Sequence, residues 1–436
     1  MKKIILSVLV AMVLAACTKE ETSISKIEEV KNPYAVTPDE AVQLLKTVIG
    51  GETTRAVSIG DIKTLRKSDF VPTTRGGEDG DLIYIVDLEN GGSAVMGADK
   101  RMEPIYAILD ETKISPEKLT QVATRGDDSE QDIEDYVMGL MNNKIQVDIN
   151  GFEHNFPEMP MIPRPQEITF TTMLGSKYPM LATKWHQSFP FNSRFPYGED
   201  DGKYFENGVM LAGCGPIAVA QVLYFHRMPT VLHNYIPNYN LLSQCEYQGT
   251  FSDAACAEVA EYVYRIAGQI CDDLYHVEEP KPSVNAIDLP NNLRAFGLDA
   301  EALAIYDISG VKTLLETNLP VIVRGTHYDP NGIVLNDAGH MWVIDGYKSY
   351  RESTYLREFY GAGPKDFTDS LINSIDYNLV HCNYGWAGES DGYYTSGIFD
   401  LATNLSDDNI VDTIGDIKSP QLYDFSNMIK YVVYEK

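Results

Sequence analysis

The stretch that decides the fold reads GCGPIAVAQVLYFHRMP and runs from Gly213 to Pro229. Between Pro216 and Pro229 it contains no helix breaker, and apolar residues recur on most sides of the helix that this spacing indicates. A proline fits the first turn of a helix, where its missing N–H has no partner to lose. The pattern therefore predicts a largely buried helix that begins beside Cys214.

Cys214 lies at the N-terminal end of this predicted helix. Unpaired N–H groups and the helix dipole at that end favour the thiolate, which is the nucleophilic form of cysteine. Gly213 and Gly215 allow close approach of a substrate carbonyl. Taken alone, such a cysteine is more often a small buried residue that opens a core helix. The assignment as a nucleophile therefore depends on the other segments of the sequence.

The composition bounds the class of protein. The chain has 436 residues, of which 44% are apolar, so it can build about two to three domains with sizeable cores. Acidic residues outnumber basic ones 63 to 35, and the net charge is −28. Such a charge argues against binding to nucleic acid and against electrostatic docking on anionic lipid.

The N-terminus has the layout of a targeting segment. Two lysines precede a short apolar run that ends at Ala16, and this run is too short to span a bilayer. The sequence Leu14-Ala15-Ala16-Cys17 resembles the box of bacterial lipoproteins, in which the cysteine is lipidated. Residues 18–21 resemble the export signal of Bacteroidetes surface lipoproteins. We expect a signal peptide at 1–16, a tether at 17–33, and an outer-membrane lipoprotein that is exposed at the cell surface or secreted after processing.

Four further cysteines leave two possibilities open. They can form disulfides in one of three pairings, or remain free thiols: Cys245, Cys256, Cys271 and Cys382. The sequence contains no CxxC or HExxH spacing, so it gives no support to a metal site, and we expect no cofactor.

The segment 34–167 predicts a small α+β domain. Thr37 and Glu40 form a capping box before an apolar helical stripe. Residues 82–86 and 93–96 predict two strands joined by a hairpin turn, and residues 105–109 predict a third. We expect loops over 58–77, an exposed loop or helix start over 125–135, and a proline-rich connection over 151–166.

The segment 168–436 has longer elements rich in aromatic residues. It predicts helices over 254–270 and 283–296, followed by strands over 319–323, 341–344 and 377–380. A helix-rich part followed by strands favours the α+β class over alternating βαβ units.

Four residues outside the helix carry side chains suited to peptide hydrolysis with Cys214. The amide of Gln187 is a neutral donor for a developing oxyanion. His340 opens a β-rich run and can take the thiol proton and return it to the leaving amine. The side-chain oxygen of Asn383 can fix the tautomer of that imidazole, and Trp386 can shield the bond from water.

These segments resemble the streptopain family of papain-like cysteine peptidases. The matching stretches follow the order of that family: 185–192 (WHQSFPFN), 212–229 (AGCGPIAVAQVLYFHRMP), 339–346 (GHMWVIDG) and 383–386 (NYGW). Upstream, 91–110 (GGSAVMGADKRMEPIYAILD) resembles the inhibitory propeptide of the family. Two features depart from the family pattern. Tyr384 stands where a tryptophan is usual, and the stretch 349–380 is longer than usual, which predicts an extra loop or helical insertion.

The resemblance implies an α+β fold with a papain-like, two-lobed catalytic domain over 168–436, made of a helical lobe and an antiparallel β lobe. An inhibitory propeptide domain would occupy 34–167. Cys214 would be the nucleophile, His340 the general base and acid, and Gln187 the oxyanion donor. The function that we expect is a secreted, lipid-anchored cysteine endopeptidase made as a zymogen. Its partners would be protein or peptide substrates, its own propeptide, and the outer membrane through lipidated Cys17.

Two other functions remain open at this point. One is a catalytically silent surface lipoprotein that binds host protein through the same groove. The other is a different Cys-His acyl transferase, such as an amidase or a transglutaminase. The complete set of Gln187, Cys214 and His340 argues against the first, because a binding module needs none of the three. The Asn-Tyr-Gly-Trp segment and the propeptide-like stretch argue against the second.

Overall fold

The structure is a computed structural model, and it falls into two units, Met1–Ala35 and Val36–Lys436. The first unit holds the predicted signal peptide and the whole of the predicted tether, and only three of its residues are described. The described residues are 32, 34–50, 58–70, 80–89, 91–120, 133–155, 166–199, 204–232, 234–247, 249, 251–271, 274, 282–285, 287–328, 334–359, 367–399 and 429–436.

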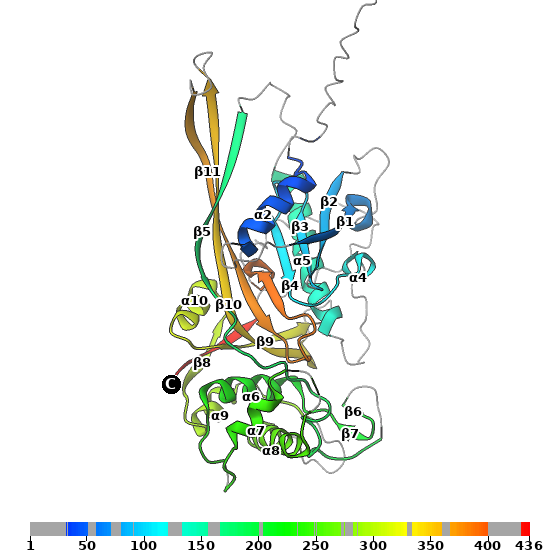
Figure 1. The fold of residues 1–436 in the computed structure, drawn as a ribbon, viewed down its shortest axis with the longest axis vertical. Coiled ribbons are helices and arrows are strands. Elements are labelled where there is room, and N and C mark those ends of the chain that lie inside the picture. The colour runs from blue at the N-terminus through cyan, green and yellow to red at the C-terminus, as the bar shows by residue number, and fades with distance from the viewer. Residues whose placement is uncertain are drawn as a thin grey trace, which may run out of the picture. The chain divides into compact units, whose positions relative to one another are not determined.

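A single antiparallel sheet of eleven strands organises the described part of the second unit (Figure 1). Its order is β1-β2-β3-β4-β12-β11-β10-β9-β13-β8, and β5 pairs with β10 beside this path. The strands are β1 (Ile59–Arg66), β2 (Asp81–Leu88), β3 (Ser93–Gly97), β4 (Ile105–Leu109), β5 (Gln166–Lys177), β8 (Asp299–Ile305), β9 (Val321–Tyr328), β10 (Val334–Phe359), β11 (Phe367–Asn383), β12 (Gly392–Thr395) and β13 (Lys430–Glu435). The α+β fold class is thereby confirmed.

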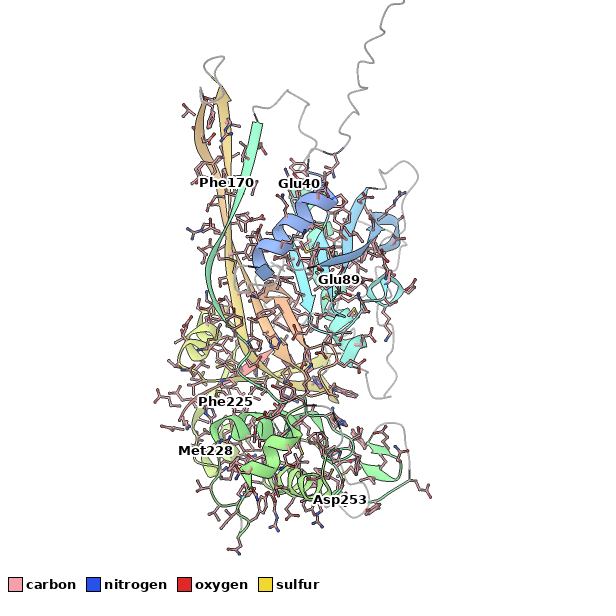
Figure 2. All side chains as sticks on the ribbon, viewed as in Figure 1. Glu40, Glu89, Phe170, Phe225, Met228 and Asp253 are labelled. Carbon is pink, nitrogen blue, oxygen red and sulfur yellow. The ribbon has the colours of Figure 1, made fainter. Side chains whose placement is uncertain are left out.

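Four of the described helices lie together in one lobe. Helices α6 (Cys214–His226), α7 (Tyr239–Leu242), α8 (Asp253–Ile270) and α9 (Leu289–Ala295) gather at one end of the sheet, together with the short ribbon β6 (Phe205–Glu206) and β7 (Val209–Met210). Figure 2 labels Phe225, Met228 and Asp253 in this helical lobe. The other helices are α2 (Pro38–Gly50), α3 (Lys67–Phe70), α4 (Pro116–Thr120), α5 (Ile133–Asn155) and α10 (Ile308–Glu316).

Helix α6 is buried on nearly all sides, as its sequence predicts. Ile217, Val219 and Val222 are fully buried, although they lie on different sides of the helix. The helix packs against α8 on one side and against β9 and β10 on another. The nucleophile segment is therefore the central element that joins the helical lobe to the sheet.

The predicted propeptide segment forms the first four strands of the sheet. Strands β2, β3 and β4 are the predicted ones, and α2 begins with the predicted capping box, in which the Glu40 N–H donates to Thr37 Oγ1 at 3.3 Å and the Thr37 N–H donates to Glu40 Oε2 at 2.8 Å. Helix α2 buries Ala41 and Leu45 in a small core that also contains Tyr350. Strand β4 pairs with β12, so the sheet continues from this segment into the segment that carries His340.

The prediction of a loop or helical insertion over 349–380 is wrong. Strands β10 and β11 pair from Phe359–Phe367 to Val343–Asn383, and β5 pairs along the other edge of β10. These strands form an arm whose exposed side chains include Phe170 (Figure 2). Ion pairs across the strands, such as Arg357 with Asp369 at 2.7 Å, stabilise pairing without an apolar alternation in the sequence.

Three other elements differ from the sequence predictions. Residues 58–77 include β1 and α3, and β1 lies at the sheet edge with Leu65 as its single buried residue, so it gives no apolar alternation. Helix α5 buries Lys144, which is paired with Asp148 at 2.5 Å and with Glu103 at 3.4 Å. Charged and amide residues on a buried face interrupt the apolar stripe by which a helix is recognised.

The predicted helix over 283–296 is shorter in the structure, where α9 begins at Leu289. Pro290 lies in its first turn, a position that proline favours. The described cysteines Cys214, Cys245, Cys256, Cys271 and Cys382 are free thiols. Within the described ranges, no helix is both long and apolar enough to cross a membrane.

Candidate active site

Cys214 is the first residue of α6, as predicted, and its side chain is half-buried. The preceding residue, Gly213, adopts φ 85°, a conformation that other residues rarely take. A Cβ atom on Gly213 would also lie 2.8 Å from the Pro282 side chain. Glycine is therefore required before the cysteine for two separate reasons, one conformational and one steric.

The thiol of Cys214 lies against β10. The backbone of Met341, the residue after His340, lies close enough to the thiol to favour its ionised form. Burial raises the pKa of the Cys214 thiol, while the Met341 backbone and the positive charge of Arg324 act in the opposite direction. The sequence predicts that the helix end favours the thiolate, whereas in the intact chain the loss of water contact outweighs the effect of the helix end on the pKa of Cys214.

The imidazole of His340 is held by the loop that follows β11. Its Nε2 atom lies 3.1 Å from the carbonyl oxygen of Tyr384. A carbonyl oxygen only accepts hydrogen bonds, so Nε2 carries a proton, and in the neutral ring Nδ1 keeps the lone pair that can accept another. The ring also stacks on Trp342, with centroids 6.2 Å apart and planes 11° apart. Tyr384 thus contributes its backbone carbonyl oxygen to the site.

The amide of Asn383 has partners other than the imidazole. Its Oδ1 atom accepts from Gln221 Nε2 at 3.1 Å and from the Gly385 N–H at 3.1 Å, and its Nδ2 atom donates to the Thr183 carbonyl oxygen at 2.7 Å. The role that the sequence suggests for Asn383, direct orientation of the imidazole, is performed here by the carbonyl of the next residue.

Gln187 and Trp386 lie on segments that adjoin the nucleophile. Gln187 is buried, and its carbonyl oxygen accepts from the Ala212 N–H at 2.8 Å, two residues before the cysteine. The Ala387 N–H donates to the Trp185 carbonyl oxygen at 3.1 Å, which joins the segment of Gln187 to that of Trp386. All four predicted segments therefore meet, and the structure brings the five predicted residues into one region.

The sequence reasoning missed a cluster of carboxylates around the buried His381. The ring Nδ1 lies 2.6 Å from Asp345 Oδ1, and Nε2 lies 3.2 Å from Asp110 Oδ2. Burial lowers the pKa of His381, but the two carboxylates outweigh it and raise the pKa to about 10. Nearby, burial raises the pKa of Asp391 to about 7. The available signal was a charged or ionisable residue, Asp345 in β10 and His381 in β11, within stretches that a buried strand normally fills with apolar residues.

Residues 110–113 lie across the loop that follows Trp386. Besides the Asp110–His381 pair, the Glu111 carboxylate lies 2.8 Å from Lys184 Nζ, and Thr112 Oγ1 accepts from the Ser390 N–H at 2.9 Å. These residues surround a hollow of about 540 Å³, whose walls come from both predicted domains: Glu111, Thr112, Lys113, Lys184, Tyr247, Ala387, Gly388 and Glu389. The predicted propeptide thus contacts the segments that hold Gln187 and Trp386.

A cysteine at a helix N-terminus, a histidine on the facing sheet and a buried glutamine are the parts of a thiol-dependent hydrolase. Residues 294–394, which include His340, Asn383 and Trp386, match the sequence model of the Peptidase C10 family. The class of protein is therefore a cysteine-type endopeptidase. The match also confirms the resemblance to the streptopain family, of which Peptidase C10 is the family model.

Two of the solved structures to which the chain is similar come from Prevotella intermedia. One is a prointerpain A fragment in which a cysteine is mutated to alanine, with 18% identity, 86% of this chain and 100% of that chain covered, and a TM-score of 0.49. Another is the active wild-type interpain A cysteine protease, with 22% identity, 60% and 95% covered, and a TM-score of 0.38. No curated protein matches the sequence.

Proposed function

We propose that the chain hydrolyses peptide bonds through Cys214 and His340, with Gln187 as an oxyanion donor, and that it is made as a zymogen. The Nδ1 atom of His340 takes the thiol proton. The thiolate then attacks the scissile carbonyl, and the Gln187 amide donates to the oxygen that becomes negative. The imidazolium returns the proton to the leaving amine, and a water molecule hydrolyses the thioester to the acid and the free thiol.

The observation that carries this proposal is the meeting of the four segments at α6. The thiol lies close enough to the Met341 backbone, next to His340, for that backbone to favour its ionised form, and the imidazole is held by the residue after Asn383. The segment of Gln187 bonds to the residues before the cysteine. A silent binding protein would have no need for such connections between four separate parts of the chain.

We also propose that residues 34–167 are an inhibitory propeptide. The contacts of residues 110–113 with Lys184, Ser390 and His381 support this proposal, because they lie beside the segments of Gln187 and Trp386. The pairing of β4 with β12 supports it as well. In this proposal residues 168–436 are the peptidase domain, and cleavage between them and the propeptide releases activity.

The anchoring of the protein is proposed from the sequence alone. The Leu14–Cys17 box and the short apolar run before it support a lipidated Cys17 and an outer-membrane location, with surface display. Both segments lie outside the described residues. Replacement Cys17→Ser should release the protein from the membrane fraction, and unchanged membrane attachment would contradict the lipid anchor.

The test of the catalytic assignment compares two variants of the processed enzyme. Cys214→Ala should abolish peptide cleavage and leave the thermal unfolding midpoint near that of the wild type. Gln187→Ala should lower kcat by roughly a hundredfold with little change in KM, because an oxyanion donor acts mainly in the transition state. Peptide cleavage at the wild-type rate by the Cys214→Ala variant would refute the proposal.

A further inference from the structure

Gln221 lies on the same side of α6 as Cys214, seven residues further along. Two helical turns separate the residues, which corresponds to about 10 Å along the axis. The side chain of Gln221 is fully buried within the helical core. A buried amide is costly unless its polar atoms are bonded, so the question is which groups bond to it.

Both polar atoms of the Gln221 amide have partners on catalytic segments. Its Oε1 atom accepts from the Thr183 hydroxyl at 2.6 Å, and its Nε2 atom donates to Asn383 Oδ1 at 3.1 Å. Asn383 then donates back to the Thr183 carbonyl oxygen at 2.7 Å, which closes a ring of three residues. Thr183 and Asn383 are themselves almost fully buried.

Two members of this ring lie on segments of the proposed machinery, and the third, Gln221, lies on the nucleophile helix itself. Thr183 opens the segment that leads to Gln187. Asn383 precedes Tyr384, whose carbonyl oxygen holds the His340 imidazole. The turn at Gly385 lies directly on α6, since a Cβ atom there would lie 2.9 Å from Ile217 and 3.9 Å from Gln221 Nε2.

We propose that Gln221 is a positioning residue for peptide hydrolysis, because its amide holds the Thr183 and Asn383 segments in fixed positions relative to the nucleophile helix α6. Through Asn383 it fixes the Tyr384 carbonyl and therefore the tautomer of the His340 imidazole. Through Thr183 it fixes the segment of Gln187. This inference rests on the proposed roles of Cys214, His340 and Gln187, and it adds a residue that does not touch the substrate.

The first test is Gln221→Met, which keeps the length of the side chain and removes both hydrogen bonds. It should lower kcat by roughly tenfold to a hundredfold, because small misplacements of catalytic groups have effects of this size. KM should stay within about twofold of the wild type, since the substrate does not reach this residue. The measurement uses the full chain after activation by limited cleavage, with titration of the active thiol.

The second test, Gln221→Glu, separates positioning from a purely structural role. A neutral carboxyl group can donate to Asn383 and accept from Thr183, as the amide does, whereas a carboxylate has no proton to donate. Burial favours the neutral form. The ratio of the kcat of this variant to that of the wild type should therefore be near one at low pH and should fall as pH rises. Thr183→Val, which removes the hydroxyl but keeps the shape, supplies the same measurement if Gln221→Met does not fold.

His226 provides a matched control on the same helix. Its ring is buried and lies 3.0 Å from the Tyr434 hydroxyl, at the opposite end of α6 from Cys214. His226→Phe should lower the thermal unfolding midpoint but leave kcat unchanged. A folded Gln221→Met variant with wild-type kcat would overturn the inference. The inference would also be overturned if kcat fell in proportion to the loss of stability in both Gln221→Met and His226→Phe. An inactive wild type, or cleavage by the Cys214→Ala variant, would instead refute the proposed function.

Discussion

The Cys214 thiol and the His340 imidazole are held in the intact chain by different neighbours. The Met341 backbone lies close enough to the thiol to favour its ionised form, and the imidazole donates to the Tyr384 carbonyl oxygen. In papain-type pairs the thiolate is stabilised by the imidazolium, and the thiol pKa falls to about 3–4. Here burial acts against the thiolate, so the environment of Cys214 in the intact chain is that of a resting nucleophile.

This environment predicts slow alkylation of Cys214 in the intact chain. Burial raises the pKa of Cys214, so its reaction with a haloacetamide at pH 5–6 should be slow and should accelerate as pH rises. After processing, modification at pH 5–6 should become at least roughly tenfold faster, because the imidazolium then stabilises the thiolate. Mass spectrometry of the alkylated peptides gives the rate for each cysteine. Fast modification of Cys214 at pH 5–6 before processing would contradict the raised pKa.

A second prediction at this scale concerns the stability of the His381 cluster. The pKa of Asp391 is about 7 in the folded chain because of its burial, against about 3.9 for an exposed aspartate. Between these values the folded state binds more protons than the unfolded state, so this group makes stability fall as pH rises from about 4 to 7. Asp391→Asn keeps the acceptor for the Tyr384 N–H and removes the titration.

The thermal unfolding midpoint of the Asp391→Asn variant, relative to the wild type, should therefore increase between pH 5 and pH 8. An increase of roughly 2–4 °C corresponds to about 1 kcal/mol for a domain of this size. The pKa of His381 is raised as well, so the stabilisation that its protonated form gives is lost at higher pH, between about pH 6.5 and 10. A constant difference between variant and wild type over pH 5–8 would contradict the assignment for Asp391.

At the scale of elements, the predictable parts are those whose local signals agree with their surroundings. Helix α2 has a capping box and an apolar stripe, and α6 has an uninterrupted apolar run, so both begin where the sequence predicts. The hairpin of β2 and β3 follows from its turn and its β-rich strands. In contrast, the buried face of α5 contains the charged residue Lys144, which interrupts its apolar pattern. The arm of β10 and β11 depends on pairing between strands, which no local sequence pattern predicts.

The capping box of α2 allows a prediction for this element. Thr37→Ala removes the hydroxyl that accepts from the Glu40 N–H, and loss of such a cap costs about 1 kcal/mol. Denaturant unfolding of the full-length chain should show a lower midpoint, because α2 packs on the core that contains Tyr350. The control is Thr47→Ala in the same helix, at an exposed position, where alanine is the better helix former and no loss is expected. Equal loss in both variants would exclude a capping effect.

At the scale of the whole molecule, the sequence predicts which segments form the site but not how they are connected. Cys214, His340 and Gln187 follow from their chemistry and their order in the chain. The ring of Gln221, Thr183 and Asn383, and the pairing of Asp110 with His381, join residues that are 38 to 271 positions apart. Single hydrogen bonds between such distant residues leave no periodic signal, so they emerge only when the chain is folded.

The last prediction concerns latency, and it follows from the way the two segments share one sheet. Strand β4 pairs with β12, and residues 110–113 contact Lys184, Ser390 and His381. In the uncut chain these contacts are intramolecular, so the inhibited state should not depend on protein concentration. A protease site can be inserted within 156–165, which lies outside the described residues. Cleavage at this site should turn the contacts of β4 and of residues 110–113 into contacts between two polypeptides. Activity per molecule should then increase on dilution, since mass action favours the separated state. The same cut in the Cys214→Ala variant should give no activity. Intact chains that cleave peptides as fast as the cut and diluted enzyme would show that residues 34–167 do not inhibit it.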